Sequence, residues 1–313
     1  MFIEQAFQKE TEILVKILNF FKYLGGSFIV FLAAIVGQIP LSVAILLSGK
    51  IPNDTEEMYQ VFDPNVFLFL TLLSFVCALI GLYFVVKKLH QQKFISIITS
   101  RAKIDWSRVF LSFGVWTLVS IVAFFVPYLL DPSTIEVQFE PVPFLILFAI
   151  TMLLMPIQTS TEELVFRGYL MQGFYNLAHN KWFPLLMTSI IFGTMHIFNP
   201  EVEKMGYLIL VYYIGTGLFL GIITLMDEGT ELALGFHAAN NMVASLLVTT
   251  DFTVFQTPSI FKDLSEPSIN FELFIPVLVL FPALVYFFSK KYKWNNWHDK
   301  LIGTNVTTEK TSV

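Results

Sequence analysis

Charged side chains are scarce in this chain of 313 residues. Only 14% of the residues are Asp, Glu, Lys or Arg, and 55% are hydrophobic. Soluble domains carry about 25% charged residues. With a mean hydropathy of +0.69, the chain is typical of one polytopic membrane domain rather than of two soluble ones.

Cysteine is almost absent. Cys77 is the single one and lies in an apolar run, which excludes a disulfide within the chain and a metal site built on cysteines. The N-terminal stretch also lacks a basic region followed by a short apolar core and a cleavage site. We therefore expect no cleaved signal peptide.

Long apolar runs are what the chain has in abundance. A membrane helix needs about 20 such residues, and the runs predict an all-α polytopic membrane protein with about eight transmembrane helices. The run 142–177 would be about 54 Å long as one straight helix, so we expect a break or kink at Pro156. The eight runs are 24–48, 66–86, 108–130, 142–177, 182–199, 205–226, 231–249 and 271–289.

Lysine and arginine gather in two connecting segments. Residues 87–108 carry six of them and residues 290–300 carry four. Because basic loops stay on the cytoplasmic side, and assuming a bacterial source, we expect an integral protein of the bacterial cytoplasmic membrane with both termini in the cytoplasm. Residues 94–105 are expected to form an interfacial helix.

Three charges stand out in the segment 160–170. Glu163 and Arg167 are four residues apart, so on a helix they share a face and can pair. Glu162 points about 100° away and is left as an unpaired, reactive carboxylate. The spacing also fits an ion pair at the membrane boundary, of little energetic value, and spacing alone does not decide between the two.

Two histidines lie in runs without any charge. His196 lies within the uncharged stretch 182–200 and His237 within the uncharged stretch 232–248, where Asn241 follows one helical turn later on the same face. A single histidine on an apolar helix is more often a satisfied core residue, but two of them with an isolated glutamate indicate a site. The other histidines lie in polar connecting segments and are expected to be solvated: His90, His179 and His298.

Helix lengths constrain how these groups can meet. A helical hairpin places Glu162 and His196 at similar depth on its two arms. At about 1.5 Å per residue, however, His196 and His237 lie towards opposite sides of a core about 30 Å thick. We therefore expect a tilted or displaced fifth helix, or a loop 227–231 that dips into the protein, so that these side chains and Asn241 converge on a water-accessible cavity.

Two chemistries could use these groups. In the first, Glu162 and His196 hold and deprotonate a water molecule that attacks a peptide carbonyl, while His237 and Asn241 donate hydrogen bonds to the oxyanion. In the second, Glu162, His196 and His237 bind zinc, which acidifies its bound water. The zinc helix H-E-x-x-H is absent from the sequence, and three ligands on three helices are a less specific pattern.

The order of these residues resembles the CPBP family of intramembrane endopeptidases, which includes CAAX prenyl proteases and bacteriocin-processing (Abi) proteins. The family motif E-E-x-x-x-R is similar to "EELVFR" at 162–167, and F-x-x-x-H is similar to "FGTMH" at 192–196. The motif H-x-x-x-N is similar to "HAANN" at 237–241, which ends with Asn241. Each motif is short, but the three occur in order over about residues 145–250. Residues 1–140 are similar only in being helical and apolar.

The resemblance implies that Glu162 and His196 activate the water and that His237 and Asn241 form the oxyanion site. Members of the family are also described as metallopeptidase-like. We favour a reaction without a metal ion, with zinc bound by Glu162, His196 and His237 as the alternative. The resemblance implies supporting roles for three more residues: Glu163, Arg167 and Phe192.

The chain then divides into three parts: N-terminal transmembrane helices (1–140), a peptidase core (141–250), and a last transmembrane helix with a polar tail (251–313). We expect an intramembrane endopeptidase that acts on a peptide or protein tail in the lipid bilayer, with no nucleic-acid partner. A non-catalytic immunity or scaffold protein of the same fold is the alternative. A transporter is disfavoured because the sequence shows no internal repeat.

Overall fold

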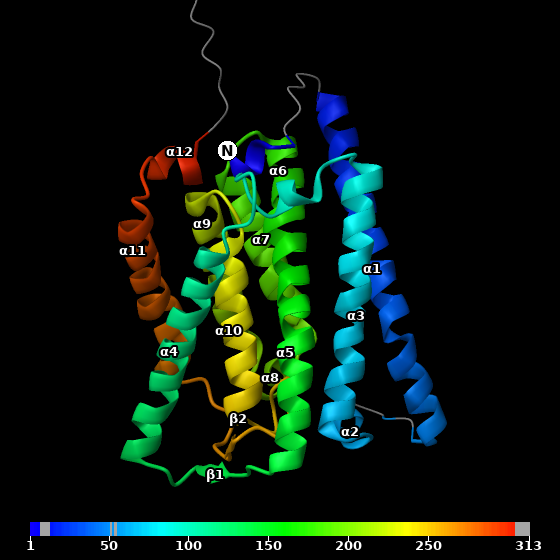
Figure 1. Cartoon of the computed structure of the whole chain (residues 1–313), viewed down its shortest axis with the longest axis vertical. Helices are drawn as coiled ribbons and strands as arrows, with labels where there is room; N and C mark the ends of the chain where they lie inside the picture. Colours follow the sequence, from blue (N-terminus) through cyan, green and yellow to red (C-terminus); the bar gives the residue numbers. More distant parts are fainter. Residues whose placement is uncertain (7–12, 51, 53–54, 304–313) are drawn as a thin grey trace, which may run out of the picture.

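The computed structural model describes residues 1–6, 13–50, 52 and 55–303, and it is almost entirely helical (Figure 1). Within this part of the chain, six helical segments are long and apolar enough to cross a membrane. The chain is therefore a polytopic all-α membrane protein, as its composition predicts. The six segments are Ile13–Ser48, Pro64–Leu89, Trp106–Leu130, Pro141–Ala178, Tyr207–Asp227 and Phe271–Tyr292.

The α-helices differ widely in length, and π-helical turns extend three of them. The longer helices are α1 (Ile13–Ser48), α3 (Pro64–Phe84), α4 (Trp106–Leu130), α5 (Pro141–Glu163), α7 (Trp182–Thr194), α9 (Leu210–Asp227), α10 (Glu231–Leu247) and α11 (Phe281–Tyr292). The short ones are α2 (Thr55–Gln60), α6 (Met171–Ala178), α8 (Pro200–Met205) and α12 (Trp297–Leu301). The π-helical turns are Val85–Leu89, Leu164–Leu170 and Pro276–Leu280.

The expected count of eight membrane helices is not confirmed. The runs 182–199 and 231–249 correspond to α7 and α10, which have 13 and 17 residues. At about 1.5 Å per residue they reach about 20 and 26 Å, less than a hydrocarbon core of about 30 Å. Both pack among other helices, α7 against α9 and α10 against α4 and α5. They carry the second and third motifs inside the bundle.

The run 142–177 forms one continuous helical segment. Helix α5 continues through Pro156, so the chain does not break there, and the alternative of a kink stays a prediction. In a membrane bundle, neighbouring groups can satisfy the carbonyl that proline leaves free. The departure from α-helical geometry comes later, in the π-helical turn Leu164–Leu170. Such turns frequently occur at functional sites, and this one directly follows the two glutamates of the first motif.

Residues 94–105 do not form the expected interfacial helix. A 3₁₀ turn covers only Phe94–Ile97, because Ile97 and Ile98 turn inward and are buried. The carbonyl of Ile98 accepts a hydrogen bond from the amide of Thr230 at 2.7 Å. The segment therefore lies over the connection between α9 and α10, which dips into the protein. Of the two arrangements expected to bring His196 and His237 together, the structure has the one in which the loop 227–231 dips into the protein.

Buried charges fix this arrangement. Asp227 accepts hydrogen bonds from Arg101 at 3.2 Å and from Arg108 at 2.5 Å, and Arg101 also pairs with Glu231 at 3.2 Å. The side chains of Asp227 and Glu231 are 1% and 0% exposed. A buried carboxylate needs such partners to offset its lost hydration. The network ties the segment before α4, and α4 itself, to the connection between α9 and α10.

A small sheet lies at the end of the molecule opposite to the N-terminus (Figure 1). Strand β1 (Ile135–Val137) pairs antiparallel with β3 (Phe261–Asp263), and β3 pairs parallel with β2 (Val248–Thr249). Because β2 follows α10 directly, the sheet anchors the C-terminal end of the helix that carries the third motif.

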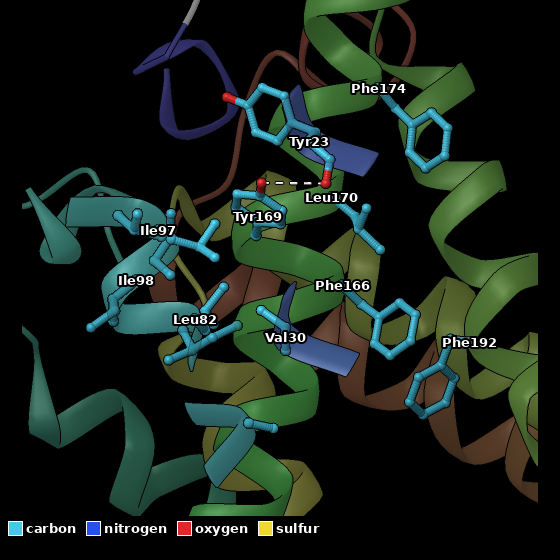
Figure 2. Close-up of a cluster of buried hydrophobic side chains, with 14 residues drawn as sticks. Tyr23, Val30, Leu82, Ile97, Ile98, Phe166, Tyr169, Leu170, Phe174 and Phe192 are labelled. Atoms are coloured by element: carbon cyan, nitrogen blue, oxygen red, sulfur yellow. Dashed lines mark hydrogen bonds between the residues drawn. The ribbon is translucent and has the colours of Figure 1, made fainter. Parts of the chain in front are cut away.

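An apolar cluster joins α1 and α3 to the first-motif segment (Figure 2). Within it, Oη of Tyr169 lies 3.3 Å from the carbonyl oxygen of Tyr23 and 2.7 Å from Nε2 of His90. Burial, and then the charge of Lys22, lowers the pKa of His90 to about 4. His90 is half-buried and its ring packs on Tyr23 and Tyr169, so it is less solvated than predicted, whereas His298 is exposed as expected.

Gly168 provides a test of this packing. A Cβ atom there would lie 2.2 Å from the carbonyl oxygen of Ile97, a backbone atom that cannot move without shifting its segment. We expect Gly168→Ala to destabilise the protein by about 1–3 kcal/mol, measured as a lower unfolding temperature in detergent. Gly114→Ala in α4 is the matched control, because its Cβ would meet nothing within 4 Å. Equal unfolding temperatures for the two variants would contradict the packing.

Candidate active site

The ion pair of the first motif lies inside the helix bundle. Nη1 of Arg167 donates to Oε1 of Glu163 at 2.8 Å, and Nη2 donates to the carbonyl of Gly217 on α9 at 3.2 Å. Both charged side chains are 0% exposed. The alternative of an ion pair at the membrane boundary is therefore excluded, and the pair links the end of α5 to α9.

Glu163 has a second partner that the sequence did not reveal. Nδ1 of His237 lies 2.7 Å from the same oxygen, Oε1 of Glu163. A carboxylate at this position accepts, so Nδ1 carries the hydrogen. This fixes the imidazole so that its other nitrogen, Nε2, faces Glu162, whose Oε2 is 3.6 Å away. His237 thus lies between the two neighbouring carboxylates of the first motif.

Glu162 differs from its neighbour in exposure and in partners. Its side chain is 19% exposed, against 0% for Glu163. Its Oε1 accepts a hydrogen bond from Nε2 of Gln158 at 2.5 Å. Helix geometry suggested that Glu162 has no partner, and this prediction is wrong. Gln158 lies one helical turn before Glu162 on α5. A polar side chain at that spacing inside an apolar run was the signal that could have identified it.

A chain of amide groups extends from Glu162 to α4. Nδ2 of Asn241 donates to Oε1 of Gln158 at 3.0 Å, and Nδ2 of Asn240 donates to Oδ1 of Asn241 at 3.1 Å. Nε1 of Trp116 on α4 then donates to Oδ1 of Asn240 at 3.1 Å. Since the indole can only donate, the direction of every bond in the chain is determined. One hydrogen of the Asn241 amide remains available to another acceptor.

His196 lies in the 3₁₀ turn Met195–Phe198 that follows α7. Its Nδ1 is 2.8 Å from the carbonyl oxygen of Phe192. A carbonyl only accepts, so Nδ1 carries the hydrogen and Nε2 keeps a lone pair, which is the form that a base requires. In the described part of the chain, no hydrogen bond or ion pair joins His196 directly to Glu162.

The ring of Phe192 is the link between the two histidines. Its centroid lies 4.9 Å from that of His196 and 6.0 Å from that of His237, and the guanidinium carbon of Arg167 lies 4.3 Å from it. The edge of Phe166 packs against the same ring (Figure 2). The structure therefore brings the second and third motifs together around an aromatic side chain of the second.

The proposed zinc ligands do not form a metal-binding group. Among the described residues, no three His, Cys, Asp or Glu side chains are grouped so that they could hold one metal ion. Glu162 and His237 are neighbours, whereas in the described part of the chain no hydrogen bond joins His196 to either, and the ring of Phe192 packs against both histidines. The donor set of Glu162, His196 and His237 therefore does not fit zinc in this arrangement.

The chain is similar to known proteins in the region that carries the site and beyond it. Residues 141–243 match the family model described as "Type II CAAX prenyl endopeptidase Rce1-like". "Uncharacterized protein YyaK" of Bacillus subtilis (strain 168) is 30% identical over 266 residues, which cover 83% of this chain and 89% of that protein. No solved structure matches the chain. With this relative and the family match over the three motifs, the chain belongs to the Rce1-like family of CAAX-type membrane proteases, the CPBP family that its motifs resemble.

Proposed function

We propose that the protein is an intramembrane endopeptidase that hydrolyses a peptide bond with a water molecule activated by Glu162 and His196. The observation that carries this proposal is the double contact of His237, which has Nδ1 on Glu163 at 2.7 Å and Nε2 facing Glu162 at 3.6 Å. A buried imidazole held between two carboxylates is suited to moving a proton and to stabilising charge at a reacting atom. The family is one of proteases.

In the proposed reaction the water molecule lies between Glu162 and Nε2 of His196. One of these groups takes a proton from the water, whose oxygen attacks the carbonyl carbon of the substrate. The same proton is then delivered to the nitrogen of the leaving amine. The hydrogen bond from Gln158 holds Glu162 in place, and the bond from His196 to the carbonyl of Phe192 holds one edge of the imidazole ring.

His237 and Asn241 would bind the oxyanion. Asn241 keeps one amide hydrogen free of Gln158, and a proton on Nε2 makes His237 a donor as well. That proton also balances the charges of the site, because two carboxylates then face one guanidinium and one imidazolium. A buried group of charges is more stable when it is neutral overall.

The substrate that we propose is a peptide or a protein tail that reaches the site within the bilayer. We place the protein in a bacterial cytoplasmic membrane, with both of its own termini in the cytoplasm. The two basic segments, 87–108 and 290–300, support this orientation, because both lie at the end where the N-terminus lies (Figure 1). Both segments contact the connection between α9 and α10. Nζ of Lys300 donates to the carbonyl of Met226, and the amide of Ser100 donates to the carbonyl of Glu228.

Glu162→Gln tests the catalytic proposal. Glutamine keeps the shape of the side chain but cannot take a proton, so we expect kcat/KM for a peptide library to fall by about 10²- to 10⁴-fold. The unfolding temperature should change less than it does in a variant of Glu163, because Glu162 is partly exposed and its pair with His237 is long, at 3.6 Å. Wild-type cleavage by this variant would refute the role of Glu162. A variant that lacks cleavage but fulfils the cellular function would favour the non-catalytic immunity or scaffold protein.

Glu163→Gln is the matched variant at the neighbouring position and should act on stability. It leaves the buried guanidinium of Arg167 without a carboxylate, and breaking a buried ion pair costs about 3–5 kcal/mol. We therefore expect a clear drop in the unfolding temperature in the detergent used for Glu162→Gln. The proposed division of roles fails if Glu162→Gln is the less stable of the two variants.

We further propose that catalysis needs no metal ion. Treatment of the purified protein with a chelator should then leave the cleavage rate unchanged, with Glu162→Gln measured in parallel as the background from contaminating proteases. Loss of activity on chelation, followed by recovery with added zinc, would instead support Glu162, His196 and His237 as zinc ligands.

A further inference from the structure

His196 lies in a turn that gives it little support. The other side chains of the turn are largely exposed: 63% for Met195, 37% for Ile197 and 90% for Phe198. The hydrogen bond from Nδ1 to the carbonyl of Phe192 holds one edge of the ring, but it does not fix the tilt of the ring plane. A base that must meet a water molecule in one direction needs a second contact.

Tyr213 on α9 provides that contact. Its ring stacks on His196, with centroids 4.1 Å apart and planes 19° apart. The hydroxyl group of Tyr213 donates to Oε1 of Glu201, which also accepts from Nδ2 of Asn199 at 3.0 Å. Glu201 is 4% exposed. The tyrosine is thus held at its far end by a carboxylate that is itself buried and hydrogen-bonded.

Close packing of α7 on α9 sets the register of the stacked rings. A Cβ atom on Gly193 would lie 2.8 Å from the amide nitrogen of Ile214, the residue after Tyr213. One turn further along α9, a Cβ atom on Gly217 would lie 2.9 Å from the carbonyl oxygen of Ser189. The two backbones therefore touch at two successive points next to the stacked rings, which leaves Tyr213 little freedom to slide past His196.

We propose that Tyr213, anchored by Glu201, is a positioning residue for His196 and keeps its Nε2 directed towards the water beside Glu162. Neither residue belongs to the three motifs, and the inference rests on the proposed function. Glu201 acts here as a hydrogen-bond acceptor. Its Oε2 is buried without a hydrogen-bond partner in the described structure, so binding of a cationic group of the substrate is the competing role that the test must separate.

The first measurement compares kcat and KM of Tyr213→Leu, Tyr213→Phe and the control Tyr212→Phe. Removal of the stacked ring should lower kcat by about 10- to 100-fold and leave KM nearly unchanged, because the ring touches His196 and not the substrate. Tyr213→Phe keeps the ring without its anchor and should lose less. The control should match wild type. A wild-type kcat for Tyr213→Leu would overturn the inference.

Substitutions of Glu201 separate the acceptor from the charge. Glu201→Gln can still accept hydrogen bonds from Tyr213 and Asn199, so it should retain the wild-type kcat and KM, whereas Glu201→Leu should lower kcat as Tyr213→Phe does. If Glu201→Gln raises KM only for peptides that carry Lys or Arg, the carboxylate binds a cationic substrate group and the positioning role is refuted.

A spectroscopic measurement makes the inference independent of cleavage. With ¹⁵N-histidine-labelled protein in detergent, and signals assigned by comparison with His196→Gln, the ring of His196 should show a single tautomer with hydrogen on Nδ1. In Tyr213→Leu the bond to the carbonyl of Phe192 still sets the tautomer, but the ring is no longer held at one tilt, so its ¹⁵N signals should broaden. Signals as sharp as in the wild type refute the positioning role even if the protein cleaves peptides. Conversely, full cleavage by Glu162→Gln refutes the proposed function and leaves this result standing.

Discussion

One carboxylate oxygen holds the site together. Oε1 of Glu163 accepts from Arg167 at 2.8 Å and from His237 at 2.7 Å, which joins α5 to α10; the bond from Arg167 to the carbonyl of Gly217 adds α9. The oxygen is buried, so water cannot replace either donor. Removing the carboxylate would leave a buried cation unpaired, and it would free the imidazole to turn away from Glu162. The geometry of the site depends on this atom.

The two neighbouring glutamates have different surroundings because successive side chains on a helix point about 100° apart. Helix α5 ends at Glu163, and the π-helical turn that follows carries Arg167. Glu163 faces the bundle interior with two hydrogen-bond donors, whereas Glu162 is partly exposed and has an amide and an imidazole nearby. The carboxylate of Glu163 is closed off from solvent, whereas that of Glu162 is partly exposed and can exchange protons with a substrate. This contrast supports the proposal that Glu162 carries the chemistry.

The i, i+4 spacing was enough to predict the pair of Glu163 with Arg167, because that contact is local to one helix. The shared face of His237 and Asn241 was predictable for the same reason. Predictions made by counting residues along the chain failed where the local structure depends on contacts with residues far away in the sequence. The buried carboxylates of Asp227 and Glu231 pair with Arg101 and hold its segment inward. Helices α7 and α10 are shorter than a membrane span and pack among other helices. The contact of His237 with Glu163 joins residues 74 positions apart.

Helices in a bilayer gain little from hydrophobic association with one another, so close packing and polar contacts must hold them. The glycines near the motifs show this: Gly168, Gly193 and Gly217 each approach a neighbouring backbone so closely that a Cβ atom would lie within 2.9 Å of it. The buried polar groups therefore hold the bundle together as well as supplying the chemistry. Burial alone cannot tell a reactive group from a structural one in such a protein. Access separates them: Glu163 and Arg167 are fully buried and pair with each other, although Oε2 of Glu163 and Nε of Arg167 have no hydrogen-bond partner among the described residues. Glu162 is partly exposed, and the Nε2 atoms of His196 and His237 are the imidazole nitrogens that do not anchor their rings to Phe192 or Glu163.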